Sequence, residues 1–141
     1  MHFHYFKPSR ILSQYIKYYW VLEANAAECE ICERVIPTEN IELMFHYENP
    51  FVVKHINNSV TKQPRSFVSG INNTYKDVST NGNSGVIAVS FFPLGACNFF
   101  DFPLLEIENS TINLEDIYND TIKSIEDRIG SASTLHQRIN I

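Results

Sequence analysis

The feature that most constrains the fold is an apolar run that ends at a proline and a glycine. Residues 85–92 read Gly-Val-Ile-Ala-Val-Ser-Phe-Phe, and Pro93 and Gly95 follow. A run of this length, rich in β-branched and aromatic residues, is typical of a strand buried on both faces. Pro93 has no N–H for a sheet ladder, so we expect the strand to end there. The sequence therefore predicts a chain that is β-rich before this point and helical after it.

Before residue 85, strand-like segments alternate with turn residues. The Asn-Gly-Asn-Ser segment at 81–84 is the strongest hairpin signal, because Asn and Gly tolerate the positive φ that tight turns require. A short helical segment is expected near residues 9–16. Seven strands are expected at 17–24, 29–36, 41–47, 51–56, 65–71, 75–79 and 85–92. Short strands at this spacing predict an antiparallel sandwich or barrel.

After Gly95 the apolar spacing becomes helical. We expect one or two helical turns at 96–102, an irregular stretch at 104–111, and a longer helix with Asn113 as its N-cap and Gly130 as its C-cap. The apolar stripe of that helix comprises Leu114, Ile117, Tyr118, Ile122, Ile125 and Ile129. A last helix begins after Ser133 and is expected to continue beyond Ile141. The predicted class is α+β, mainly β: one domain over 1–141, with a β barrel at about 17–94 and a helical part at about 95–141.

Composition excludes several functional classes. Hydrophobic residues make up 44% of the 141 residues, which is typical of one globular domain. The net charge of −5 argues against a surface that binds nucleic-acid phosphates. No apolar segment has the length of a membrane span, so we expect no membrane partner and a cytoplasmic protein.

Cys29 and Cys32 have the Cys-x-x-Cys spacing, but a second pair is missing, and residues three apart on a strand point to opposite faces. Two reduced cysteines are expected.

The histidines give little support to a metal enzyme. His2 and His4 have the spacing of a metal-binding pair but lie at the end of the chain, where strands fray. His46 and His55 fall on separate expected strands, and His136 is in the tail. The chain also has no nucleophile elbow and no glycine-rich phosphate loop. We therefore expect neither a bound metal nor a cofactor, and no enzymatic activity.

The expected strand at 41–47 has two different faces. One face carries Ile41, Leu43, Phe45 and Tyr47 and is the natural core, whereas the other carries Glu42, Met44 and His46. Inside a barrel with a cavity, the second face offers polar groups to a ligand, and aromatic side chains suit flat or amphipathic molecules. The candidate ligand-binding residues are Tyr18, Trp20, Glu42, Met44, His46 and Phe91. The alternative is that the aromatic residues simply pack in the core.

Four segments together resemble a known family. Residues 12–20 (LSQYIKYYW), 33–37 with 41–46 (ERVIP and IELMFH), 67–70 (FVSG) and 89–96 (VSFFPLGA) look like the N-terminal regions of AraC-type transcription regulators. The resemblance implies a cupin-like jelly roll that senses a small-molecule effector, followed by helices used for dimerisation. It also implies a C-terminal pair of helix-turn-helix motifs that binds DNA. That basic half is absent from this chain, so DNA contact is expected only through it.

The sequence thus favours an effector-sensing and dimerisation domain of an AraC-type regulator. We expect a homodimer formed through the stripe on the helix between Asn113 and Gly130, because reading two adjacent DNA half-sites requires a dimer. Two alternatives from other classes stay open. One is a small cupin-type metal-dependent enzyme, and the other is a free-standing small-molecule binding protein.

Overall fold

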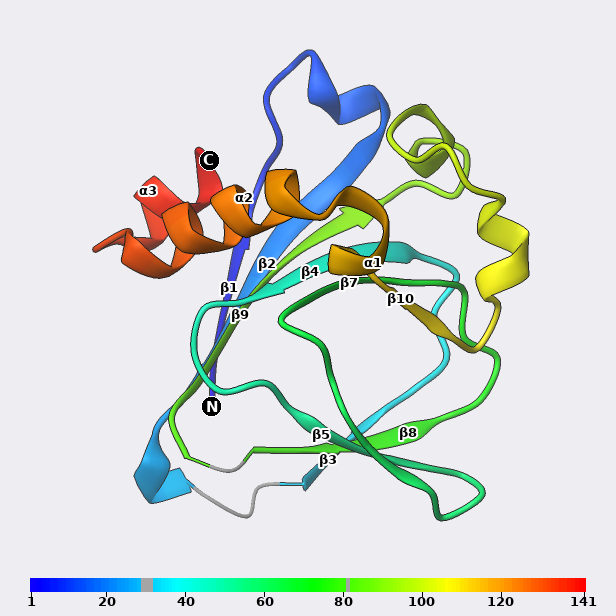
Figure 1. Cartoon of the computed structure of the whole chain (residues 1–141), viewed down its shortest axis with the longest axis vertical. Coiled ribbons are helices and arrows are strands. Elements are labelled where there is room, and N and C mark those ends of the chain that lie inside the picture. Colours follow the sequence, from blue (N-terminus) through cyan, green and yellow to red (C-terminus); the bar gives the residue numbers. More distant parts are fainter. Residues whose placement is uncertain (29–31, 81) are drawn as a thin grey trace.

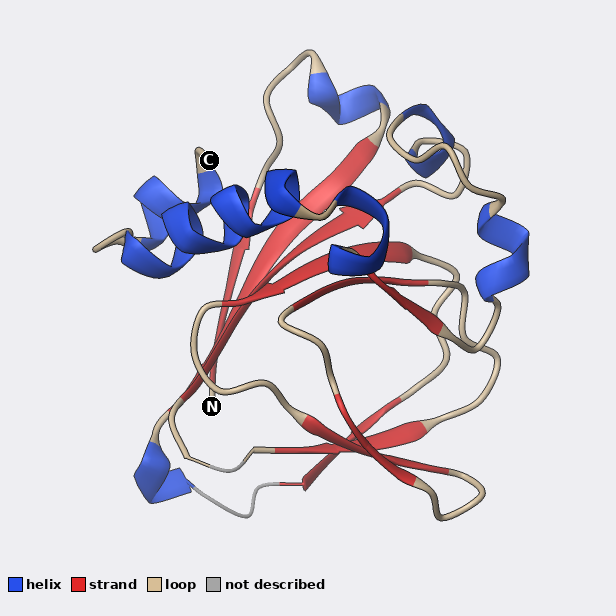
Figure 2. Cartoon of the chain, viewed as in Figure 1, coloured by secondary structure: helices blue, strands red, loops and turns tan. Residues whose placement is uncertain are grey.

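The structure is a computed structural model of the chain, and it describes residues 1–28, 32–80 and 82–141. Figure 1 and Figure 2 show two sheets that face each other, with α2 and α3 lying across the outer face of one of them. The predicted class, α+β and mainly β with antiparallel sheets and C-terminal helices, is confirmed.

The larger sheet contains the buried strand from which the sequence argument began. Its strand order is β1 (His2–Phe6), β2 (Ile16–Ala24), β9 (Ser84–Phe91), β4 (Ile41–His46), β7 (Ser66–Ser69) and β10 (Thr111–Asn113). Every neighbouring pair is antiparallel. β9 lies between β2 and β4 and is buried along almost its whole length, as its apolar run predicted.

The smaller sheet has the order β3 (Cys32–Val35), β8 (Lys76–Ser79), β5 (Val52–His55) and β6 (Val60–Lys62), again antiparallel. Both strand orders are open, and no closed barrel is found in the part of the chain that the structure describes. The expected strands at 17–24, 41–47, 51–56, 65–71, 75–79 and 85–92 are all present, with ends displaced by at most two residues. The strand expected at 29–36 is described from Cys32 onward, and Asn81 of the expected turn lies outside the described residues.

Three strands were not predicted. β1 was expected to fray, but its five residues all pair with β2, which supplies the backbone partners that an isolated end would lack. β6 is short and exposed, so it has no apolar alternation to reveal it. β10 returns to the edge of the larger sheet beside β7, whereas the sequence predicted only helical and irregular segments after Gly95.

The helical segments are shorter than predicted. Single 3₁₀ turns occur at η1 (Leu12–Gln14), η2 (Ala26–Glu28), η3 (Ala96–Asn98) and η4 (Leu104–Ile107). The long helix is divided into α1 (Glu115–Tyr118) and α2 (Asp120–Ser131), because Asn119 has a positive φ of 45° and interrupts the helical backbone.

The predicted ends of the long helix were wrong in detail. Asn113 is the last residue of β10, although its side-chain oxygen still accepts a hydrogen bond from the backbone N–H of Glu115 at 3.1 Å. Gly130 lies inside α2, whose C-cap is Ala132. The last helix, α3 (Leu135–Ile139), begins after Thr134, which forms a capping box with Gln137. No helix among the described residues has the length and apolarity that a membrane crossing requires.

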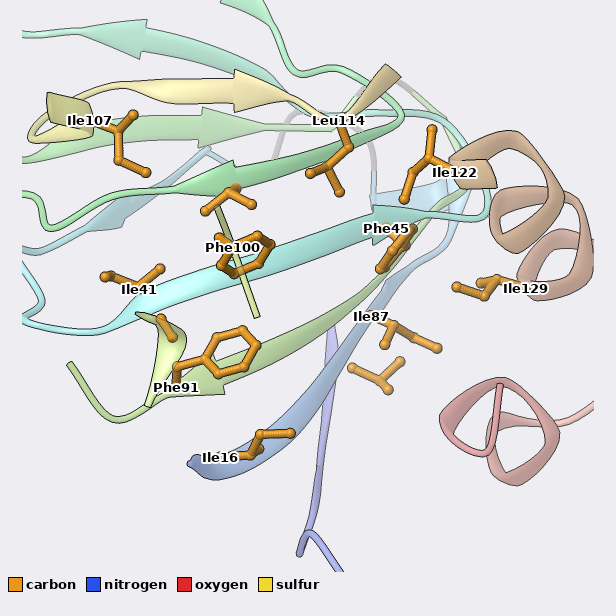
Figure 3. Close-up of a cluster of buried hydrophobic side chains, with 13 residues drawn as sticks. Ile16, Ile41, Phe45, Ile87, Phe91, Phe100, Ile107, Leu114, Ile122 and Ile129 are labelled. Atoms are coloured by element: carbon orange, nitrogen blue, oxygen red, sulfur yellow. The ribbon is translucent and has the colours of Figure 1, made fainter. Parts of the chain in front are cut away.

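The larger sheet has a hydrophobic core on each face. On the outer face, side chains of β2, β4 and β9 pack against the helical segments, as Figure 3 shows. This outer core comprises Ile16, Val21, Ile41, Phe45, Val68, Ile87, Phe91, Ala96, Phe100, Ile107, Leu114, Ile122 and Ile129. Between the sheets lies a second, smaller core of Leu22, Phe51 and Val86, with Met1, Trp20, Met44 and Val78 packed against it.

A buried carboxylate attaches α2 to the larger sheet. Glu126 is only 3% exposed, and the hydroxyl of Ser66 on β7 donates to its Oε1 at 2.5 Å. Arg65 donates from Nη2 to the backbone oxygen of Glu126 at 3.2 Å. Because a buried carboxylate without a partner is costly, these contacts determine where α2 lies on the sheet.

Candidate ligand cavity between the sheets

The inner face of the larger sheet leaves space beside its only tryptophan. Residues paired across antiparallel strands point to the same face, and Ala88 of β9 pairs with both Trp20 of β2 and Met44 of β4. A methyl group therefore lies between two large side chains. The smaller sheet forms the opposite wall, because Val78 of β8 packs into the same inter-sheet core.

This space is a cavity of about 170 Å³. Most of its lining is apolar, and its polar lining groups are the indole of Trp20 and the side chains of Glu33, Gln63 and Lys76. The lining residues are Met1, Phe3, Trp20, Leu22, Glu33, Val35, Met44, Phe51, Gln63, Lys76 and Val78. An apolar cavity with a few polar groups is the usual form of a small-molecule site.

Trp20 is held by a buried carboxylate. Its indole N–H donates to Glu42 Oε1 at 2.9 Å, which fixes the ring against the cavity. Burial raises the pKa of the Glu42 carboxyl, while the Trp20 hydrogen bond and the charge of Lys76 act in the opposite direction. Burial likewise lowers the pKa of Lys76, against the charge of Glu42. No ion pair within 4.0 Å joins these two described side chains.

His46 lies behind the cavity wall and is only 2% exposed. Its ring stacks on Phe67, with ring centroids 6.0 Å apart, and meets the edge of Phe51 at 5.0 Å. Its Nε2 is 2.9 Å from Gln63 Oε1, an oxygen that can only accept, so Nε2 carries the proton. Burial lowers the pKa of His46 to about 4. This histidine is therefore a neutral packing residue that positions Gln63.

A second, larger hollow adjoins the cavity. This groove has a volume of about 560 Å³ and lies between the smaller sheet and the chain segments around residues 72 and 110. Gln63 and Lys76 line both the groove and the cavity. The other groove residues are Val53, His55, Ile56, Asn57, Ser59, Thr61, Lys62, Pro64, Asn72, Thr74, Tyr75, Asn109, Ser110 and Thr111.

The structure brings most of the candidate ligand residues to one region. Trp20 and Met44 line the cavity, Glu42 binds Trp20, and His46 holds Gln63. Tyr18 lies two residues before Trp20 on β2, and its ring contacts Tyr5 of β1, with centroids 5.7 Å apart.

Phe91 is not brought to the cavity. It belongs to the outer core and packs against Phe99 and Phe100, because position 91 on β9 has the opposite parity from Ala88. Sequence reasoning missed Lys76, Gln63 and Val78. The parity of the expected strand at 75–79 groups Lys76 with Val78, but only the packing of the sheets shows that this face points inward.

The apolar stripe of the C-terminal helices packs within one chain. Leu114, Ile122 and Ile129 are buried in the outer core, and Tyr118 and Ile125 pack against it. Ile117 differs, since it is 42% exposed. The stripe predicted as a dimer interface therefore already has an intramolecular role, and Ile117 is its exposed member.

The histidines and cysteines of the sequence argument are dispersed. Among the described residues, no group of three or more His, Cys, Asp or Glu side chains converges on a possible metal site. His2 and His4 lie on the exposed edge strand β1, and Cys32 is exposed at the start of β3. Cys29 lies outside the described residues.

Comparison with known proteins gives one family. A family model described as "Domain of unknown function (DUF6597)" matches residues 4–113. This range ends at β10 and includes all but the first two residues of β1, so Met1 and Phe3 of the cavity lining lie outside it. No curated protein matches the chain.

Proposed function

The chain belongs to the family described as a domain of unknown function (DUF6597), and we propose that this member binds a small-molecule effector in the cavity between its two sheets. The observation that carries the proposal is the cavity itself: an apolar space beside Trp20 and Met44, with Gln63 and Lys76 in its wall. A cavity of about 150 Å³ is known to suffice for a ligand the size of benzene.

The resemblance to AraC-type regulators connects effector binding with the control of transcription. In this proposal the two sheets form a cupin-like effector-sensing domain that forms homodimers in the cytoplasm, and a basic domain outside these 141 residues contacts DNA. Whether the effector activates or represses is a property of that larger assembly. The acidic balance of the chain agrees with DNA contact being made elsewhere.

The two cores of the larger sheet supply a route from effector to helices. Met44 faces the cavity, while its neighbour Phe45 faces the outer core that contains Ile122 of α2. A ligand that displaces β4 therefore changes the packing under α2. A free-standing binding protein would use the same cavity, but it would have no need for this response of the helices.

Binding can be tested through the single tryptophan. We expect toluene, used as a benzene-sized probe, to shift the fluorescence of Trp20 and to raise the melting temperature, because it fills the apolar cavity. Val78→Phe puts a ring into the cavity, and we expect it to abolish both effects. Val52→Phe is the matched control, because position 52 lies on the alternate face of the same smaller sheet.

The comparison of Val78→Phe with its control, Val52→Phe, tests the proposal. The proposal is supported if the parent and Val52→Phe respond to toluene while Val78→Phe, still folded, does not. An equal response in Val78→Phe, or no response in the parent, would show that the cavity does not bind small molecules.

A further inference from the structure

Two long side chains separate the cavity from the groove. Gln63 and Lys76 line both spaces, and both side chains can change rotamer without moving the backbone. The side-chain oxygen of Gln63 is hydrogen bonded to His46. The boundary between the two spaces is therefore made of adjustable side chains.

The chemistry of the two spaces differs. The cavity is lined mainly by aliphatic and aromatic side chains. The groove is lined by hydroxyls, amides, the apolar or aromatic side chains of Val53, Ile56, Pro64 and Tyr75, and three basic residues, His55, Lys62 and Lys76. No Asp or Glu is among its described lining residues. The whole chain has a net charge of −5, so a groove whose described lining contains basic side chains and no carboxylates differs in charge from the chain as a whole.

Resting on the proposed function, we propose that the cavity and the groove are two parts of one channel that binds an elongated amphipathic anion. Its apolar end fills the cavity beside Trp20, and its anionic end lies in the groove beside Lys76. Along β8, Val78 in the cavity wall and Lys76 at the boundary are two residues apart, about 7 Å. A ring with a short aliphatic linker spans this distance.

The neighbouring carboxylates fit this orientation. Glu42 is hydrogen bonded to Trp20, on the cavity side of the boundary, and does not line the groove. Glu33 lines the cavity and not the groove. An anionic group thus avoids both carboxylates when it lies in the groove, whereas the reverse orientation would place it beside them.

The test uses a matched set of probes: 4-phenylbutyrate, 4-phenylbutanol and 4-phenylbutylamine, with toluene as the apolar end alone. We expect 4-phenylbutyrate to bind at least tenfold more tightly than the amine. In amide NMR spectra it should shift both the Trp20 indole N–H, in the cavity, and the backbone N–H of Ser110, in the groove. Toluene should shift the Trp20 signal without the Ser110 signal.

The role of Lys76 is tested by Lys76→Met, which keeps an unbranched apolar stem and removes the charge. We expect the ratio of the affinities for 4-phenylbutyrate and 4-phenylbutanol to fall about tenfold, because the two probes share the same apolar end and only the butyrate loses the charge interaction with Lys76. Lys54→Met is the matched control, because Lys54 is exposed on the alternate face of β5. If Lys76→Met does not fold, as shown by its melting curve, Lys76→Gln replaces it with the same expected loss.

The outcomes separate this inference from the proposed function. If toluene binds but the butyrate and the amine bind equally, or if the Ser110 signal does not respond to the butyrate, the cavity is a closed apolar site and the channel is refuted. If none of the four probes shifts the Trp20 signal, both proposals fail.

Discussion

Mild acid is expected to destabilise this protein through His46. Burial lowers the pKa of this imidazole from the ordinary 6.5 to about 4, while the Gln63 hydrogen bond acts in the opposite direction. The unfolded chain therefore binds a proton near pH 6 that the folded chain does not bind. The stability that the neutral imidazole contributes is fully present above pH 6.5 and is lost as the pH falls toward about 4.

The magnitude follows from the difference between the two pKa values. Each unit of difference corresponds to about 1.4 kcal/mol, so the full loss through His46 is about 3 kcal/mol. Between pH 7 and pH 5 we expect about 2 kcal/mol of it, a large share of the stability of a typical single domain. The raised pKa of Glu42 acts with the opposite sign, since a proton that it binds in the folded state stabilises that state as the pH falls.

Urea denaturation at a series of pH values between 7 and 5 measures the effect. His46→Phe removes the titrating ring while keeping an aromatic side chain between Phe51 and Phe67. We expect its free energy of unfolding to fall by about 2 kcal/mol less than that of the parent over this range. The same substitution at exposed His136 is the control and is expected to retain the parent's loss, because His46 is intact.

The change in the free energy of unfolding between pH 7 and pH 5 is compared among the three proteins. The contribution of Glu42 cancels in this comparison, because all three proteins contain it. The reasoning would be refuted if His46→Phe remained folded and lost as much stability between pH 7 and pH 5 as the parent. It would also be refuted if the parent became more stable over that range while His46→Phe behaved in the same way.

Two further predictions concern the C-terminal helices. Ile122→Ala is expected to lower the free energy of unfolding by about 2–4 kcal/mol, because Ile122 is buried in the outer core. Ile117→Ala should lower it by well under about 1 kcal/mol, because Ile117 is exposed. Equal losses for the two variants in urea denaturation would contradict this placement. Gly130→Ala is expected to raise the melting temperature, with a gain of about 0.5–1 kcal/mol, because Gly130 is inside α2 and an added Cβ meets only the Arg65 Nη2, at 3.3 Å. That nitrogen donates to the Glu126 backbone oxygen, so a loss of stability would show that the Arg65 contact does not adjust to the added methyl group.

The strands of the two sheets could be predicted from the sequence because their patterns are local. The apolar run of β9 and the alternation along β4 identify strands from neighbouring residues alone. The same local patterns failed for β1 and β10. β1 is stabilised by pairing with the next strand, β2, and β10 by pairing with β7, more than 40 residues earlier. Neither pairing can be recognised from a segment of three to five residues by itself.

The candidate site could be predicted only in part, for the same reason. Alternation along β4 put Glu42 and Met44 on one face and Phe45 on the other, and that grouping is confirmed. Which face is hollow could not be decided from alternation, because both faces of the larger sheet are covered, one by helices and one by the smaller sheet.

Phe91 shows that residue type alone does not decide which face of a sheet a side chain occupies. It is aromatic like Trp20 and was grouped with it, but the antiparallel register of β2 and β9 places it on the opposite face. By contrast, Lys76 reaches the cavity only because β8 packs across from Trp20. The sequence by itself determined most of the strands, their alternation and the apolar stripe of the helices, since these depend on residues a few positions apart. Only the tertiary structure decided which face became a cavity, which charged side chains reached it and which surface the stripe covered, because each depends on contacts between segments that are distant in the chain.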